Sequence, residues 1–238
     1  MGLFWSSAKE KAEQAERDRA ARFNQVMQLA KSIVEIDPKG LLTLTRLVAA
    51  PLQAATITSA AHAGPHSARA ADSLGTLFFP WGAPVAGDHR GILDVIRCCN
   101  VESYRFRLGR DPLIATPWHR TRLAYALATI GAGKSQGAWS QDSNHQVTVL
   151  LPFGLGLVNG GNHSIAAGIA NVEGYIDSTE TLDLSPLYDL VGYDGNRFVR
   201  LRDRAVLSEP EEEVPGMLFE IGRLMLQHGI GTDMERVG

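Results

Sequence analysis

The sequence predicts an α+β protein, with a helical N-terminal region over residues 1–75 and a mixed region over residues 76–238 that ends in a helix. Three observations lead to this fold class. Apolar residues recur with helical spacing up to about residue 63, a segment dense in Gly and Pro follows, and alternating strand patterns then lie between shorter helical ones. Such segregation of helices and strands along the chain is typical of α+β proteins.

The composition is that of an ordinary globular protein. The chain has 238 residues, of which 45% are apolar and 21% charged, and its 23 Lys and Arg against 26 Asp and Glu give a net charge of -3. The chain as a whole is therefore not a polycation, and any nucleic-acid surface must be local. No run approaches the about 18 apolar residues of a membrane span. The two cysteines, Cys98 and Cys99, are neighbours that rarely bridge each other, and we expect them to form a small buried pair. We therefore expect a reduced, cytoplasmic protein.

The N-terminal region is predicted to contain three helical pieces. The first runs from about residue 8 to 36 and has a very polar first half. Asp37 and Pro38 stop it and start a second helix, which Pro51 is expected to interrupt. An Ala-rich third piece reaches about residue 63. The Gly- and Pro-rich segment 64–91 then marks a boundary or a long ordered loop.

The mixed region alternates strands with short helices. "SYRFRLG" (residues 103–109) predicts a strand with one apolar face and one basic face, formed by Arg105 and Arg107. A helix follows that begins near Pro117 and ends before Gly131. Alternation over 147–151 and a second apolar run over 155–158 predict a hairpin, after which a glycine turn leads into a helix that ends at Gly174.

The C-terminal part is predicted to hold a further hairpin and a last helix. "GYDGNRFVRL" indicates two short strands with Asp194 and Gly195 in the turn. The last helix follows the acidic segment 209–213, and its apolar face is formed by Met217, Leu218, Ile221, Leu224 and Met225. This face could serve the core or a protein partner.

"ATIGAGKSQG" (residues 128–137) contains a formal match to the phosphate-binding P-loop, ending in Lys134 and Ser135. A P-loop needs a buried strand before it and a helix after it. Here a helix precedes the match, and no helical apolar period follows it. We therefore predict that the match is accidental, with Gly131 capping a helix and Lys134 in solvent.

The turn over residues 160–164 is the leading candidate site. Gly160 and Gly161 permit a close approach, Asn162 can cap the following helix, and the exposed N–H groups of a helix start suit an anion, usually a phosphate. His163 is the candidate for catalysis. The candidate ligand-binding residues are Gly160, Gly161, Asn162, Ser164, Arg120, Arg122, Arg105 and Arg107. The structural alternative is that His163 only caps and packs, and that the glycines only serve the turn.

Two segments resemble the ParB and sulfiredoxin superfamily over roughly residues 105–174. "GGNHSIAAGI" is similar to the signature turn and Ala-rich helix of that superfamily, and "DPLIATPWHRTRL" to its strand end with an Arg before a helix. "GGNHS" is also similar to a segment of an uncharacterised bacterial family. The chain departs from the pattern at Asn162, where sulfiredoxins have their reactive cysteine, and at Ser164, where many ParB-like proteins have an Arg. Sulfiredoxin chemistry is therefore not expected.

The resemblance implies a phosphate- or nucleotide-binding protein with a nucleic-acid-associated role in a bacterium or a mobile element. Whether it catalyses a reaction is left open, and no cofactor is assigned. No metal site is expected either, because Gly64 and Pro65 break the helical spacing between His62 and His66. The alternative is a non-catalytic interaction protein that binds partners through its first or its last helix, without a membrane role.

Overall fold

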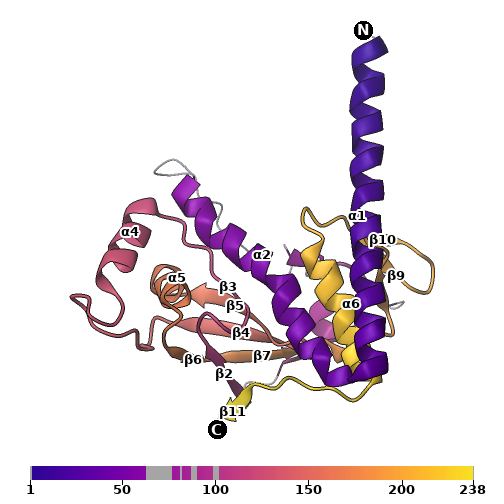
Figure 1. Ribbon diagram of the computed structural model, residues 1–238. Helices are drawn as coiled ribbons and strands as arrows, with labels where there is room; N and C mark the ends of the chain where they lie inside the picture. The colour runs from indigo at the N-terminus through magenta and orange to yellow at the C-terminus, as the bar shows by residue number, and fades with distance from the viewer. Residues whose placement is uncertain (1, 63–76, 81, 87–89, 99–101, 238) are drawn as a thin grey trace.

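The computed structural model describes residues 2–62, 77–80, 82–86, 90–98 and 102–237, and it confirms the α+β fold with helices at the N-terminus and a C-terminal helix (Figure 1). The helices are α1 (Gly2–Ile36), α2 (Leu41–His62), α4 (Arg120–Thr129), α5 (Asn162–Asn171) and α6 (Val214–Gln227). Short 3₁₀ helices are η1 (Pro38–Gly40), η2 (Ile92–Asp94) and η3 (Ser185–Leu187).

The strands form three sheets. The five-stranded sheet has the order β1 (Arg97–Cys98), β7 (Glu180–Asp183), β4 (Gln146–Leu151), β5 (Leu155–Gly160), β3 (Leu113–Ile114). The second sheet has the order β11 (Glu235–Val237), β2 (Ser103–Arg107), β6 (Tyr175–Asp177), and the third β10 (Val206–Ser208), β9 (Phe198–Arg200), β8 (Val191–Tyr193). The predicted hairpin is β4–β5, which pairs antiparallel, whereas β7 and β3 flank it in parallel.

Hydrophobic side chains form two clusters on opposite faces of the β4–β5 hairpin. Leu150 and Leu155 face the first, which also contains side chains of α1, α2, α6 and the segment around Phe78. Val147 and Val149 face the second, which β2, α4 and α5 complete. The period-two alternation of the strands sends successive residues to opposite faces, so one hairpin serves both clusters. Residues from both sides of the predicted boundary between residues 75 and 76 contribute to the first cluster.

The second N-terminal helix does not stop at Pro51. Helix α2 runs through Pro51 to His62, so the predicted interruption is wrong. Pro51 lies on the exposed side of α2, where water can hydrate the Leu47 carbonyl that proline leaves without a helical donor. By length and composition alone, one segment of the described chain, Pro38–His62, could cross a membrane, which corrects the expectation that no run is apolar enough. Five residues of α2 pack in the first cluster, namely Leu41, Leu44, Val48, Ala49 and Leu52, and 28% of the apolar window is buried.

The last helix uses its predicted apolar face for the core. Met217, Leu218, Ile221 and Met225 are buried, and α6 packs against α1 and α2 (Figure 1). This face is therefore not open to a partner. The two halves of helix α1 have different surroundings. The first half projects beyond the other elements, and the second half packs beside α6 (Figure 1).

Two smaller predictions have mixed outcomes. The turn between β8 and β9 contains Asp194 and Gly195 as predicted, and the Asp194 carboxylate accepts the N–H groups of Asn196 and Arg197. Cys98, in contrast, is exposed, and its thiol donates a hydrogen bond to Glu180. The prediction that it is buried is wrong, because β1 is an edge strand of the sheet. Cys99 and His66 lie outside the described residues.

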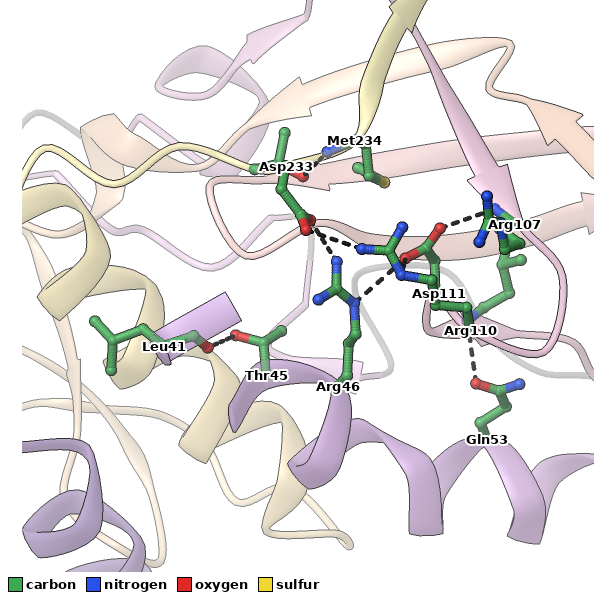
Figure 2. A network of polar contacts seen from close by, with 11 residues as sticks. Leu41, Thr45, Arg46, Gln53, Arg107, Arg110, Asp111, Asp233 and Met234 are labelled. Atoms are coloured by element: carbon green, nitrogen blue, oxygen red, sulfur yellow. Dashed lines mark hydrogen bonds and ion pairs between the residues drawn. The ribbon is translucent and has the colours of Figure 1, made fainter. Parts of the chain in front are cut away.

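A polar cluster ties the C-terminal tail to the body of the protein (Figure 2). Asp111, whose side chain is 4% exposed, accepts the backbone N–H of Arg107 at 2.8 Å and pairs with Arg46 of α2 at 3.3 Å. Arg46 also pairs with Asp233, which Arg110 contacts at 3.0 Å. Hydrogen bonding to Arg46 lowers the pKa of Asp233. These contacts hold α2, the loop after β2 and the segment before β11 together.

Candidate functional site

A cleft of about 690 Å³ lies between α4 and the start of α5. The turn contributes residues 160–164, which are the residues predicted from the sequence. The other lining residues are Trp118, His119, Thr121, Arg122, Tyr125, Ala126, Ile130, Gln136, Asn144 and Asn159. The volume is within the range of small-molecule sites, about 300 to 1,000 Å³. None of these lining residues is an Asp, a Glu or a Lys.

Backbone packing accounts for both glycines of the turn. Gly161 is the residue before α5 and has φ of +77°, and a Cβ there would lie 2.2 Å from Cδ2 of His145. A Cβ on Gly160 would lie 2.5 Å from the carbonyl oxygen of Asn144. The fold itself therefore demands glycine at both positions.

Asn162 does not cap α5, which corrects the prediction. Its side-chain oxygen instead accepts the backbone N–H of Thr116 at 2.7 Å, while the N-cap is Gly161, which has no side chain. Helix α5 therefore begins without a side-chain cap. The N–H groups of Asn162, His163 and Ser164 make no hydrogen bond within the described chain, and Ile165 is the first to bond back to Gly161. Three unpaired donors thus remain at the positive end of the helix.

His163 links the starts of the two helices. Its Nε2 accepts the backbone N–H of His119 at 3.1 Å, so the neutral ring carries its proton on Nδ1. Burial, with the nearby charges of Arg122 and His119, lowers the pKa of His163. The ring is therefore neutral at pH 7, and it can donate a hydrogen bond from Nδ1 but supplies no charge.

Ser164 belongs to an arrangement that resembles a catalytic triad but runs in the opposite direction. Its Oγ lies 2.6 Å from Nε2 of His145, and Nδ1 of His145 accepts the backbone N–H of Asp142 at 2.8 Å. The Asp142 carboxylate also lies 3.1 Å from Nδ1 of His145. In the tautomer in which Nδ1 accepts the N–H of Asp142, Nε2 donates a hydrogen bond to Ser164, which in turn donates to the carbonyl of Gly161. A nucleophilic serine needs a histidine that accepts its proton. In this tautomer His145 does not take the Ser164 proton, and Ser164 serves to hold the turn to His145.

The two candidate arginines of α4 differ in position. Arg122 lines the cleft, and its guanidinium lies 5.1 Å from the centre of the Trp118 ring. It makes no ion pair within the described chain. Arg120 is exposed and does not line the cleft. The structure thus brings Arg122, but not Arg120, to the predicted turn.

Arg105 and Arg107 lie on the second sheet and do not line the cleft. Arg105 makes two bonds to Asp177, of 2.7 and 2.9 Å, and pairs with Glu235 at 3.4 Å, while Arg107 stacks on Tyr175. On the basic face predicted for this strand, the charge of Arg105 is therefore neutralised, whereas Arg107 is exposed and pairs with no carboxylate within the described chain. The reason is that the neighbouring strands β6 and β11 place carboxylates beside Arg105.

The model of one protein family matches residues 6–232, and this family is described as a family of unknown function (DUF6710). The chain belongs to the DUF6710 family. The match includes every residue that lines the cleft. No curated protein and no solved structure matches the chain.

The P-loop-like segment is a structural connection between α4 and α5. A helix precedes it and irregular chain follows, as predicted. Lys134 is not in solvent, because its ammonium donates to the carbonyl of Leu127 and to Asn171. The Glu173 carboxylate accepts the N–H groups of Ala132 and Trp139, and these bonds lower its pKa. The lysine therefore closes the end of α4 and is not available for a phosphate.

The sequence analysis missed seven polar or aromatic residues of the cleft, namely Trp118, His119, Thr121, Tyr125, Gln136, Asn144 and Asn159. A pattern in the sequence could have identified two of them, Trp118 and Tyr125. Trp118, Arg122 and Tyr125 are spaced by four and three residues, as on one face of a helix, although α4 itself begins only at Arg120. The apolar period of the same helix lies on Leu123 and Ala126, so both rings had to be on its exposed side. Among the described residues, no group of three or more His, Cys, Asp or Glu could hold a metal ion.

We expect the protein to lose stability as the pH falls from about 7.5 to about 5.5. Burial lowers the pKa of both His145 and His163, so near pH 6.5 the unfolded chain binds more protons than the folded one. The stabilisation is present above the unfolded pKa and is lost as the pH falls through the folded values. Thermal melts over this range measure the effect. His163→Gln keeps an acceptor but does not titrate, and it should show a shallower dependence, whereas a melting temperature that stays constant or rises would contradict the expectation.

Proposed function

We propose that the protein binds a phosphate-containing ligand, a phosphate or a nucleotide, in the cleft between α4 and α5. The observation that carries this proposal is the set of three unpaired N–H groups at residues 162–164, which face a cleft that holds an arginine and no carboxylate. Backbone N–H groups at a helix start, aided by the helix dipole, are a common way to bind phosphate.

The polar groups of the turn and of Arg122 each have a defined role in this proposal. The N–H groups of the turn and Nδ1–H of His163 donate to the phosphate oxygens, and the Arg122 guanidinium supplies positive charge and two parallel donors. Ser164 has no role as a nucleophile in this proposal, because in the tautomer described above it accepts a hydrogen bond from His145. In any reaction at this site, His163 is the residue to which we assign proton transfer, and the proposal itself requires binding only.

The wider role comes from the sequence alone. The resemblance to the ParB and sulfiredoxin superfamily supports a nucleic-acid-associated role in a bacterium or a mobile element, and we keep the cytoplasm as the expected location. Arg105 is neutralised, so it adds little to a nucleic-acid surface. A second candidate function is protein–protein interaction through α1. Its projecting first half favours this, because the side chains of residues 8–15 are exposed and some of them pair with each other, as Lys9 does with Glu13.

Replacing Arg122 by alanine tests the proposal against a matched control. We expect Arg122→Ala to weaken binding of inorganic phosphate or a nucleotide at least tenfold, because about 1.4 kcal/mol of charge-assisted bonding is lost. Arg120→Ala removes the same charge from the same helix outside the cleft, and we expect it to bind like the wild type. Neither exposed change should lower the melting temperature of the unliganded protein much.

The measurement is the rise in melting temperature with added ligand, since a ligand that binds the native state stabilises it by mass action. A panel of inorganic phosphate, pyrophosphate and nucleotides covers the ligand class. If no compound raises the melting temperature of the wild type, the binding proposal fails and the interaction candidate takes its place. An equal loss of binding in both variants would mean that general charge, and not the cleft, attracts the ligand.

A further inference from the structure

The wall of the cleft that faces the start of α5 is aromatic. Trp118 and Tyr125 are 46% and 62% exposed, and both line the cleft with Arg122 between them on α4. Arg122 stacks on the Trp118 ring, and the edges of the His119 and His163 rings also meet this ring. Tyr125 has no ring partner within the described chain, although Gln136 fixes its hydroxyl group at 3.1 Å. Its face is therefore a positioned but uncovered stacking surface.

Amide groups of the cleft have unused hydrogen-bonding capacity. The side chain of Asn144 makes no hydrogen bond within the described chain. Gln136 uses its NH₂ group for Tyr125, and Asn159 uses its NH₂ group for Thr148, which leaves the oxygen of each unpaired. Donors and acceptors of this kind, next to an aromatic face, are what a planar heterocycle with polar edges requires.

The charge of the cleft limits how many phosphate groups it suits. Arg122 is the one permanently charged side chain among the described lining residues, and no carboxylate is present to hold a magnesium ion. A nucleoside triphosphate is usually bound with Mg²⁺, which an acidic residue helps to hold. The positive charge of one arginine and one helix N-terminus is closer in size to the negative charge of a single phosphate group than to that of a triphosphate.

We propose that the cleft binds a nucleotide that carries a single phosphate, without a divalent metal ion, and that its base stacks on Tyr125 within reach of Gln136 and Asn144. The proposal rests on the proposed function, because the phosphate occupies the same turn at residues 160–164. The nucleotide has two possible sources, a free nucleoside monophosphate or the 5′-phosphorylated end of an oligonucleotide.

Binding measurements on the wild type separate the parts of this proposal. The probes are the four nucleoside monophosphates, the matching nucleosides, inorganic phosphate, and ATP with and without Mg²⁺. We expect at least one monophosphate to bind at least tenfold more tightly than both inorganic phosphate and its own nucleoside. We expect Mg²⁺ to add nothing to that affinity.

Tyr125→Ala tests the stacking surface. It should weaken binding of the monophosphate about tenfold while the affinity for inorganic phosphate stays unchanged. Tyr175→Ala is the matched control, since Tyr175 is 53% exposed on β6 and does not line the cleft. The affinities of a free monophosphate and a 5′-phosphorylated trinucleotide are then compared. The ligand that binds more tightly identifies the source of the nucleotide.

Two results overturn this inference and leave the proposed function standing. One is equal affinity for inorganic phosphate and for every monophosphate, and the other is an affinity for Mg²⁺–ATP tenfold above that for any monophosphate. An unchanged affinity of Tyr125→Ala for the best monophosphate likewise removes the stacking surface. Absence of binding by every phosphate compound would instead remove the proposed function itself.

Discussion

Replacing Gly161 by alanine should destabilise the protein by about 3 kcal/mol, which is a large share of the stability of an ordinary domain. Two costs add. A residue with a Cβ at φ of +77° costs about 1 to 2 kcal/mol. The new Cβ would also lie 2.2 Å from the His145 ring, and forcing extra volume into a packed site costs about 1 to 3 kcal/mol more.

Gly133→Ala is the matched control, because it separates these two costs. Gly133 has φ of +79°, but a Cβ there would meet nothing within 4 Å. We therefore expect Gly133→Ala to show the backbone cost alone, and urea unfolding of both variants measures the difference. Equal losses in the two variants would show that His145 does not pack against the turn as described.

Replacing Asp111 by alanine should cost about 3 to 5 kcal/mol, the range seen when one partner of a buried ion pair is removed. The change leaves the N–H of Arg107 without its acceptor and takes away one carboxylate from Arg46 (Figure 2). Asp233 would still pair with Arg46, and this limits the loss. Equilibrium unfolding in urea measures the free energy.

Two variants accompany this measurement. Asp111→Asn keeps an acceptor for the N–H of Arg107 and loses only the charge, so its loss should be smaller than that of Asp111→Ala. Asp189→Ala removes an exposed carboxylate and should change the free energy of unfolding by less than about 0.5 kcal/mol. A loss in Asp111→Ala no larger than in Asp189→Ala would mean that the polar cluster does not tie the C-terminal tail to α2.

The binding proposal is tested by replacing other residues than those used for these stability predictions. Arg122 and Tyr125 are exposed residues of α4, and their replacement tests ligand binding without disturbing the core. Gly161 and Ser164 line the cleft but also pack against His145, so their replacement tests folding as well as binding. A loss of binding in Gly161→Ala would therefore not by itself show that a ligand approaches that residue.

The sequence by itself determined the local elements and their order. The β4–β5 hairpin, the glycine turn into α5 and the helical segment before Gly131 were all predictable, because side-chain periodicity and turn chemistry act over a few neighbouring residues. The same local reasoning correctly placed a helix before the P-loop-like match. It also identified the turn at residues 160–164, which does line the cleft.

Only the tertiary structure decided what the side chains of those elements do. Asn162 accepts a hydrogen bond from Thr116 and does not cap its own helix, and Ser164 is hydrogen-bonded to His145. Arg105 is neutralised by carboxylates from strands that follow it by 72 and 130 residues in the chain. Polar side chains take the partners that the assembled sheets and helices bring within hydrogen-bonding distance, and no local pattern encodes partners so far apart in sequence.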